Sequence, residues 1–113
     1  MFTLCAYLLE NEPQITSVTA KQFATMSTLK YSTYNTNTLV YNLSGVSGLK
    51  TGSTDRAGYC VAVSMPVTSG AETHDLVLVL LGAESAALRG QAGEILLRWA
   101  RDYYAEHEFR DAK

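Results

Sequence analysis

Lys50, Thr51 and Gly52 form the one short segment whose residue types could do chemistry together. They fall within an expected strand over residues 46–53, which is entered through glycines and followed by a turn and a second strand. Such a strand can present a cation and a hydroxyl to an anionic ligand. Neighbouring strand residues face opposite ways, so a twist or bulge near Gly52 is needed to bring Lys50 and Thr51 to one site. The alternative is a solvated lysine on an edge strand, beside a threonine that favours β structure.

Two more strands are expected after this one, over residues 58–65 and 75–81. The second is apolar without interruption, so it should be buried on both faces, with helices covering both sides of the sheet. The connections are short enough for antiparallel hairpins. Ser85 is placed to cap a long helix that runs to about residue 109. The expected fold class is therefore α+β, with an antiparallel sheet of the Lys-Thr-Gly strand and the two following strands, covered by a long C-terminal helix.

The other elements are less regular. Residues 3–11 are typical of a short helix, which Pro13 ends. The Thr/Ser/Asn-rich stretch that follows has its best strand at residues 17–26. Residues 34–37 are expected to form a turn or an ordered loop, because asparagine bonds its own backbone. Residues 106–113 are a polar tail that is expected to fray. The long helix is expected to bury an apolar stripe with helical spacing: Leu88, Ala92, Ile95, Leu96, Trp99 and Tyr103.

Size and composition restrict the class of protein. With 113 residues, 47% of them hydrophobic and 18% charged, the chain is expected to be one globular domain or part of one. A formal net charge of −2 gives no sign of a basic surface patch, so nucleic acid is not an expected partner. No apolar run approaches the roughly 20 residues of a membrane span, and the N-terminal run lacks the basic region and cleavage site of a signal peptide. Two cysteines are too few for a structural zinc site, and we expect no metal and no cofactor.

Three groups of residues together resemble a known family. They read N-T-N-T-L at residues 35–39, G-V-S-G-L-K-T-G-S-T at residues 45–54 and A-G-Y at residues 57–59. This order is similar to the D-alanyl-D-alanine carboxypeptidases of the low-molecular-mass penicillin-binding proteins. The resemblance runs from about Leu4 to Tyr104 and departs at Ser47, where aspartate is usual. It implies that residues 1–113 are a single partial domain, the C-terminal part of a β-lactamase/transpeptidase-like catalytic domain.

The resemblance also implies roles for individual residues. Lys50 adds positive potential and belongs to the proton network. Thr51 hydrogen-bonds the terminal carboxylate of the substrate, and Gly52 lets the backbone approach closely. The backbone N–H of Ser53 is one of two donors of an oxyanion hole. For Arg89, on the long helix, carboxylate recognition and a plain surface position both stay open.

The family's other two motifs bear on activity. They are S-x-x-K, which holds the nucleophilic serine, and S-x-N. No S-x-N occurs in the chain. Ser27 and Lys30 have the S-x-x-K spacing, but they lie in a stretch expected to be extended or irregular, whereas the family's nucleophile opens a helix far upstream of K-T-G. We therefore expect that the nucleophile is absent and that the chain alone is inactive.

The implied function is that of a fragment of a serine-type D-Ala-D-Ala carboxypeptidase, a hydrolase that trims peptidoglycan stem peptides and binds penicillin. Its partners would be the stem peptide or a β-lactam, and the parent protein would act in the cell envelope, outside the cytoplasm. One alternative is a non-catalytic module that binds a peptide carboxylate or cell-wall fragment through Lys50 and Thr51. Another is an assembly subunit, because an unpaired apolar edge at residues 75–81 would favour a homodimer or strand exchange.

Overall fold

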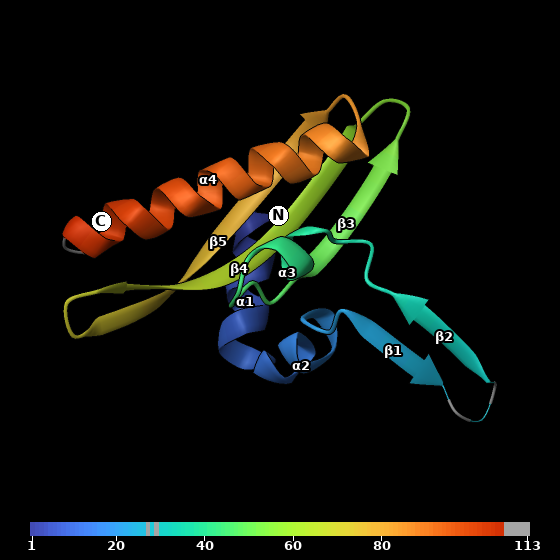
Figure 1. Ribbon diagram of the computed structural model, residues 1–113, viewed down its shortest axis with the longest axis horizontal. Helices are drawn as coiled ribbons and strands as arrows, with labels where there is room; N and C mark the ends of the chain where they lie inside the picture. Colours follow the sequence, from blue (N-terminus) through green and yellow to red (C-terminus); the bar gives the residue numbers. More distant parts are fainter. Residues whose placement is uncertain (27, 29, 108–113) are drawn as a thin grey trace.

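An antiparallel three-stranded sheet forms the centre of the computed structural model, which describes residues 1–26, 28 and 30–107 (Figure 1). The strands are β3 (Leu49–Thr54), β4 (Gly58–Ser69) and β5 (Glu72–Ala83), and they lie in the order β3-β4-β5. The predicted fold class and both hairpins are confirmed. β4 and β5 are longer than expected because their pairing continues to Ser69 and Glu72, beside the turn at Gly70. β3 begins later than expected, after the bend at Gly48, whose φ is +74°.

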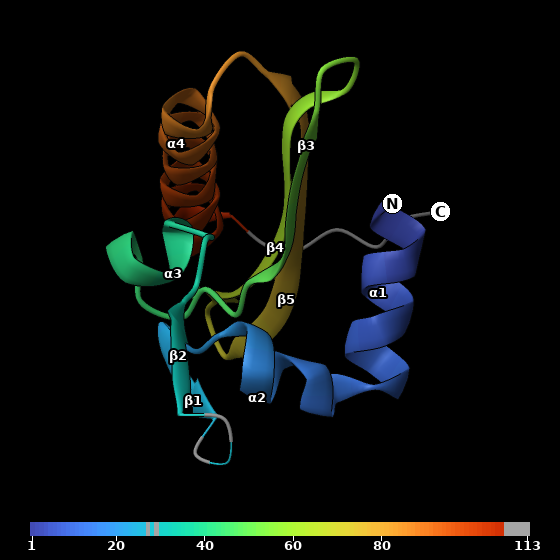
Figure 2. The same cartoon turned by 90° about the vertical axis from the view of Figure 1, so that its right-hand side faces the viewer.

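Helices lie on both sides of this sheet, as predicted (Figure 2). α1 (Phe2–Asn11) covers one face and buries Cys5, and α4 (Ala86–Glu106) covers the other. The Ser85 side chain caps α4 by accepting a hydrogen bond from the Leu88 N–H at 3.1 Å. β5, however, is only half-buried, because it is an outer strand of the sheet among the residues that the structure describes. The prediction that it is buried on both faces is therefore wrong.

The core lies between the sheet and α4. Its largest fully buried side chains include Leu39 of α3 (Leu39–Asn42), Val63 and Met65 of β4, and Leu97 of α4. Gly93 of α4 faces Leu39 so closely that a Cβ on the glycine would lie 2.8 Å from Leu39 Cδ1. A residue without a side chain is what allows the two helices to approach here.

The apolar stripe predicted for α4 is wrong. The residues that α4 buries are Gly93, Leu97 and Ala100, whereas Ile95 and Trp99 are 69% and 61% exposed. Two faces of α4 carry apolar residues. Small residues on the face of Gly93, Leu97 and Ala100 let the helix approach the sheet, whereas the larger side chains on the face of Ile95 and Trp99 point away from the sheet.

α4 contacts β4 near both of the strand's ends. At the start, the Arg89 guanidinium lies over the Tyr59 ring, 5.6 Å from its centroid. At the other end, the Ser69 hydroxyl donates a hydrogen bond to the carbonyl oxygen of His107, just beyond the helix, at 2.5 Å. The helix thus runs along nearly the whole length of β4 (Figure 1).

The strand predicted at residues 17–26 is mostly wrong. The chain turns through η1 (Pro13–Ile15) and α2 (Thr16–Thr19), and only β1 (Phe23–Met26) is extended, paired with β2 (Tyr31–Tyr34). Thr16 and Ser17 donate their hydroxyls to the carbonyls of Pro13 and Gln14, so short polar side chains stabilise turns where the sequence pattern indicated a strand. Ser27 lies outside the described residues. None of the helices described is long and apolar enough to cross a membrane.

Candidate functional site

The Lys-Thr-Gly segment lies on β3, an outer strand of the sheet within the described part of the chain. Lys50, Gly52 and Ser53 are exposed and Thr51 is half-buried. The β3–β4 pairing is regular from Leu49 to Thr54, so β3 itself carries no bulge. The irregularity instead lies between β4 and β5, between Tyr59 and Val61. Of the two devices named for bringing Lys50 and Thr51 to one site, a twist or a bulge near Gly52, β3 does not show the bulge; the irregular position is Cys60, which pairs with Gly52.

A side chain from another part of the chain contacts the segment. The Thr36 hydroxyl lies 2.9 Å from the Thr51 hydroxyl, and either can donate the hydrogen bond. Thr36 belongs to the loop of residues 34–37, which was predicted to be ordered. This contact has no signal in the sequence, because it depends on how the loop packs against the strand.

Asn35 fixes that loop to its surroundings. Its Nδ2 donates to the carbonyl oxygens of Thr19 and Lys21, at 2.8 and 2.9 Å, and its Oδ1 accepts from the backbone N–H of Asn37 at 2.9 Å. The Tyr41 hydroxyl donates to the Asn35 carbonyl at 3.0 Å. The prediction of an ordered loop is confirmed, and Thr36 is held in place on both sides.

Asn37 is buried at the same place, with 4% of its surface exposed. Its Oδ1 accepts a hydrogen bond from the Leu39 N–H, at the start of α3. Its Nδ2 has no hydrogen-bond partner among the residues that the structure describes. Unpaired buried donors are uncommon in folded proteins, so this atom needs an explanation.

A cavity of about 170 Å³ adjoins this group. Its walls come from α2, the loop of residues 34–37 and the beginning of β3: Thr19, Asn35, Thr36, Asn37, Gly48, Leu49, Lys50 and Thr51. A second cavity of about 170 Å³ also touches Lys50 and Thr51, but most of its other walls are apolar and include Met1 and Leu81. The Lys-Thr-Gly segment therefore borders one polar and one apolar cavity.

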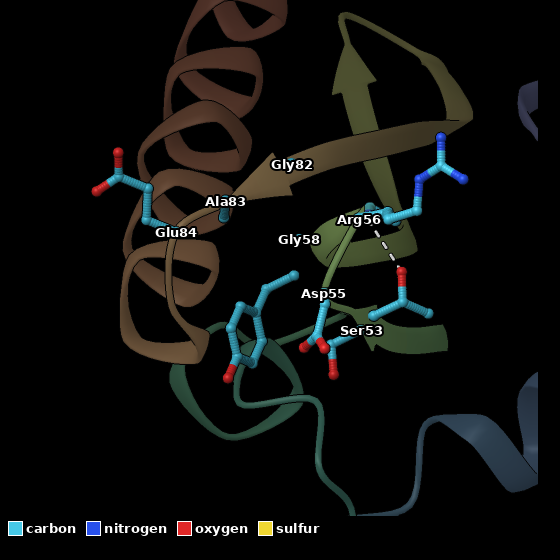
Figure 3. A pocket seen from close by; sticks show the side chains of 10 residues that line it. Ser53, Asp55, Arg56, Gly58, Gly82, Ala83 and Glu84 are labelled. Atoms are coloured by element: carbon cyan, nitrogen blue, oxygen red, sulfur yellow. Dashed lines mark hydrogen bonds between the residues drawn. The ribbon is translucent and has the colours of Figure 1, made fainter.

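A larger cavity, of about 520 Å³, lies at the β3–β4 hairpin beyond Ser53. Ser53, Asp55 and Arg56 are among the residues that line it, and the Arg56 guanidinium points away from the other two in Figure 3. The turn is closed by the Ala57 N–H, which donates to Thr54 Oγ1 at 2.9 Å. These side chains are exposed, so this cavity is open to solvent along the hairpin.

Arg89 contacts β4. Besides stacking over Tyr59, its Nη1 donates to the Cys60 carbonyl oxygen at 3.5 Å. It also lines a cavity of about 270 Å³ together with Thr36. The structure thus brings Thr36, rather than Arg89, into contact with Thr51.

Ser47 has a structural partner. Its hydroxyl contacts the Ser64 hydroxyl, and its backbone N–H donates to the Ser64 carbonyl at 2.9 Å. Ser47 and Lys50 also have the S-x-x-K spacing, a second match beside Ser27 and Lys30. They lie on the bend into a strand rather than on a helix, where residues three apart share a face. This second match therefore does not bring hydroxyl and amine together.

Known proteins are similar to this chain in sequence and in fold. The Peptidase S11 family, described as D-alanyl-D-alanine carboxypeptidase, matches residues 1–85. Penicillin-binding protein D2 from Listeria monocytogenes, in its cefotaxime-bound form, is 29% identical, with a TM-score of 0.74 over 86% of this chain and 37% of that one. PBP3 from Streptococcus pneumoniae is 25% identical, with a TM-score of 0.73 over 88% of this chain and 30% of that one.

A third structure, the D-alanyl-D-alanine carboxypeptidase DacD from Francisella tularensis, is 36% identical, with a TM-score of 0.52 over 62% of this chain and 16% of that one. No curated protein sequence matches the chain. The chain spans less than two fifths of the length of each of these structures. Because the family match covers most of its residues, and the sheet with its C-terminal helix has the same fold, the chain belongs to the D-alanyl-D-alanine carboxypeptidase family of penicillin-binding proteins.

Proposed function

We propose that β3 is one wall of the active site of a serine D,D-carboxypeptidase that trims peptidoglycan stem peptides. Family membership and the position of the segment on an outer strand support this proposal. An outer strand leaves backbone groups free, and an extended peptide can pair with them. Thr51 would bind the terminal carboxylate of the peptide, with Lys50 adding positive potential and Gly52 allowing a close approach.

The direction of the Ser53 N–H supports its proposed place in the oxyanion hole. The Ser64 N–H donates to the Gly48 carbonyl at 3.1 Å, so this carbonyl is directed toward β4. Along an antiparallel strand the backbone groups of alternate residues face the same side, so those of Lys50 and Gly52 are also directed toward β4. The N–H of Ser53 is then directed to the open edge of β3, where a carbonyl oxygen of a bound peptide would lie.

The nucleophile would come from a part of the domain that this chain does not contain, in keeping with the short share of its relatives that it spans. The parent protein would then act in the cell envelope. Penicillin-binding protein D2 has been captured with both cefotaxime and ampicillin, so a β-lactam is a fitting ligand for the complete site.

Intact mass after incubation with a reporter penicillin tests the assignment of the nucleophile. We expect no adduct on this chain, because no serine here has a helical lysine partner in the described residues. A stoichiometric adduct on Ser27 would overturn that expectation.

Binding of N-acetyl-D-alanyl-D-alanine tests the proposed role of β3 in binding the substrate. We expect weak, saturable binding that Lys50→Ala abolishes and Lys21→Ala, an exposed lysine outside the site, leaves unchanged. Equal binding by the wild type and Lys50→Ala would contradict the proposed role of β3. Binding without acylation is also what the alternative of a non-catalytic module requires.

The outer edge of β5 favours a second proposal, that the chain self-associates as a homodimer or by strand exchange. β5 is an outer strand in the described sheet, and its Leu81 is 69% exposed. Exposed apolar edges pair with other strands. Light scattering across a range of concentrations should give a mass above that of the monomer. A monomer at every concentration would contradict this proposal.

A further inference from the structure

We propose that Thr19, the last residue of α2, is a positioning residue for the Lys-Thr-Gly segment. Its hydroxyl holds the bend that leads into β3, and its carbonyl oxygen holds the loop of residues 34–37. One residue thus joins two parts of the chain that both border the proposed site. The inference rests on the proposed function, to which it adds a residue outside the S-x-x-K, S-x-N and K-T-G motifs.

The bend before β3 lies directly against Thr19. The Thr19 hydroxyl donates a hydrogen bond to the Ser47 carbonyl oxygen at 2.7 Å. The next residue, Gly48, has a φ of +74°, and a Cβ built on it would lie 2.2 Å from the Thr19 carbonyl oxygen. Glycine is required where two backbones approach so closely. No flexible side chain lies between Thr19 and Gly48, so a displacement of one is passed directly to the other.

The bend determines where β3 begins. It is also held by β4, since the Ser47 N–H donates to the Ser64 carbonyl at 2.9 Å and the Ser64 N–H donates to the Gly48 carbonyl at 3.1 Å. Lys50 and Thr51 follow Gly48 within three residues. A bend that loses one of its attachments therefore carries the start of the Lys-Thr-Gly segment with it.

The loop of residues 34–37 is attached to the same residue. Asn35 Nδ2 donates to the Thr19 carbonyl oxygen at 2.8 Å, and the following residue, Thr36, contacts the Thr51 hydroxyl at 2.9 Å. Thr19 therefore holds the loop and the strand at a fixed separation. Only the bond to the strand uses its side chain, so removing the hydroxyl should release the bend and leave the loop attached.

The hydroxyl of Thr19 differs in its partner from those of its neighbours on α2. Thr16 and Ser17 donate to the carbonyls of Pro13 and Gln14, three positions earlier, which stabilises the local turn. Thr19 donates across 28 positions of sequence, and it is half-buried. Its hydrogen bond therefore stabilises the tertiary arrangement rather than α2 itself.

Hydrogen exchange, measured by nuclear magnetic resonance, tests the attachment of the bend. Valine in place of Thr19 keeps a branched side chain but has no proton to donate. We expect the amide protons of Ser47 and Ser64, which close the bend onto β4, to exchange about fivefold faster in Thr19→Val than in the wild type. Thr19→Ser keeps the hydroxyl and should stay within about twofold of the wild type.

Two controls show whether the effect is confined to the bend. The amide proton of Asn37, which donates to Asn35 Oδ1, should exchange within about twofold of the wild-type rate in Thr19→Val, because the loop keeps its attachment. Thr16→Val removes a hydroxyl from the same helix, and it should leave the exchange at the bend unchanged, since the Thr16 hydroxyl donates to Pro13.

Binding of N-acetyl-D-alanyl-D-alanine tests the consequence for the site. Thr19→Val should bind this dipeptide about fivefold more weakly than the wild type, whereas Thr19→Ser and Thr16→Val should stay within about twofold. A residue that only stabilised the fold would lower the unfolding free energy in urea without changing the affinity of the folded chain.

The outcomes separate this inference from the proposed function. Unchanged exchange at the bend in Thr19→Val would overturn the inference, and so would faster exchange along the whole of β4 and β5, which would show a merely structural role. Faster exchange at the bend with unchanged dipeptide binding would overturn the positioning role and leave the proposed function standing. If the bend responds as expected but the wild-type chain does not bind the dipeptide, the positioning of β3 by Thr19 stands and the proposed function is wrong.

Discussion

Replacing Gly93 with alanine tests the packing of α4 most directly. Alanine in place of glycine stabilises a helix interior by about 1 kcal/mol. Here the new Cβ would lie 2.8 Å from Leu39 Cδ1, whereas carbon atoms pack at about 3.5–4.0 Å. Leu39 is fully buried and must retreat within a filled core, and overpacking of this kind costs about 1–3 kcal/mol. The net expectation is a loss of about 1 kcal/mol of unfolding free energy.

Gly90→Ala is the matched control in the same helix. Its Cβ would approach Thr38 Oγ1 at 2.7 Å, but Thr38 is exposed and its side chain can rotate away. The helical gain of about 1 kcal/mol should then remain, so the two variants should differ by about 2 kcal/mol. Urea unfolding, followed by circular dichroism, measures both. Equal stabilisation by the two substitutions would refute the close approach of α4 to Leu39.

Three further predictions concern the same framework. Leu97→Ala should lower the unfolding free energy, measured in urea, by about 3 kcal/mol. Ile95→Ala, on the exposed face, should change it by less than about 0.5 kcal/mol. Similar losses for the two variants would contradict the buried face described for α4. Ser85→Ala should cost about 1 kcal/mol by the same measurement, and no loss would mean that the cap is dispensable. Asn35→Ala should speed hydrogen exchange at the Asn37 amide, which donates to Asn35 Oδ1, without unfolding the sheet; unchanged exchange would show that other contacts hold the loop.

The sheet was predictable because its signals are local. Short turns separate strongly apolar runs, and Ser85 marks the start of α4 in the sequence itself. The buried face of α4 was not predictable from spacing alone, because two faces carry apolar residues. The signal that was overlooked is the small residues Gly93 and Ala100, which flank Leu97 at helical spacing and permit close packing.

The candidate site was predictable in part. The Lys-Thr-Gly segment stands out through its neighbours in the sequence, and so does the N-x-N spacing of Asn35 and Asn37. The contact of Thr36 with Thr51 could not be predicted from the sequence, because the two residues are 15 positions apart and only tertiary packing brings them together. The two threonines look like ordinary polar residues until the loop is placed against β3.

The attachment of α4 near both ends of β4 has a mechanical consequence. With 21 residues and a rise of about 1.5 Å per residue, the helix is a rod of about 30 Å fixed to one strand by Arg89 and by the Ser69–His107 contact. Because α4 is attached near both ends of β4, it limits how far the β4–β5 hairpin beneath it can twist. Inserting one residue in the middle of α4 would turn its two halves by about 100° relative to each other. The two anchors could then no longer be satisfied together, and the strain would fall on the β3–β4 hairpin next to Ser53.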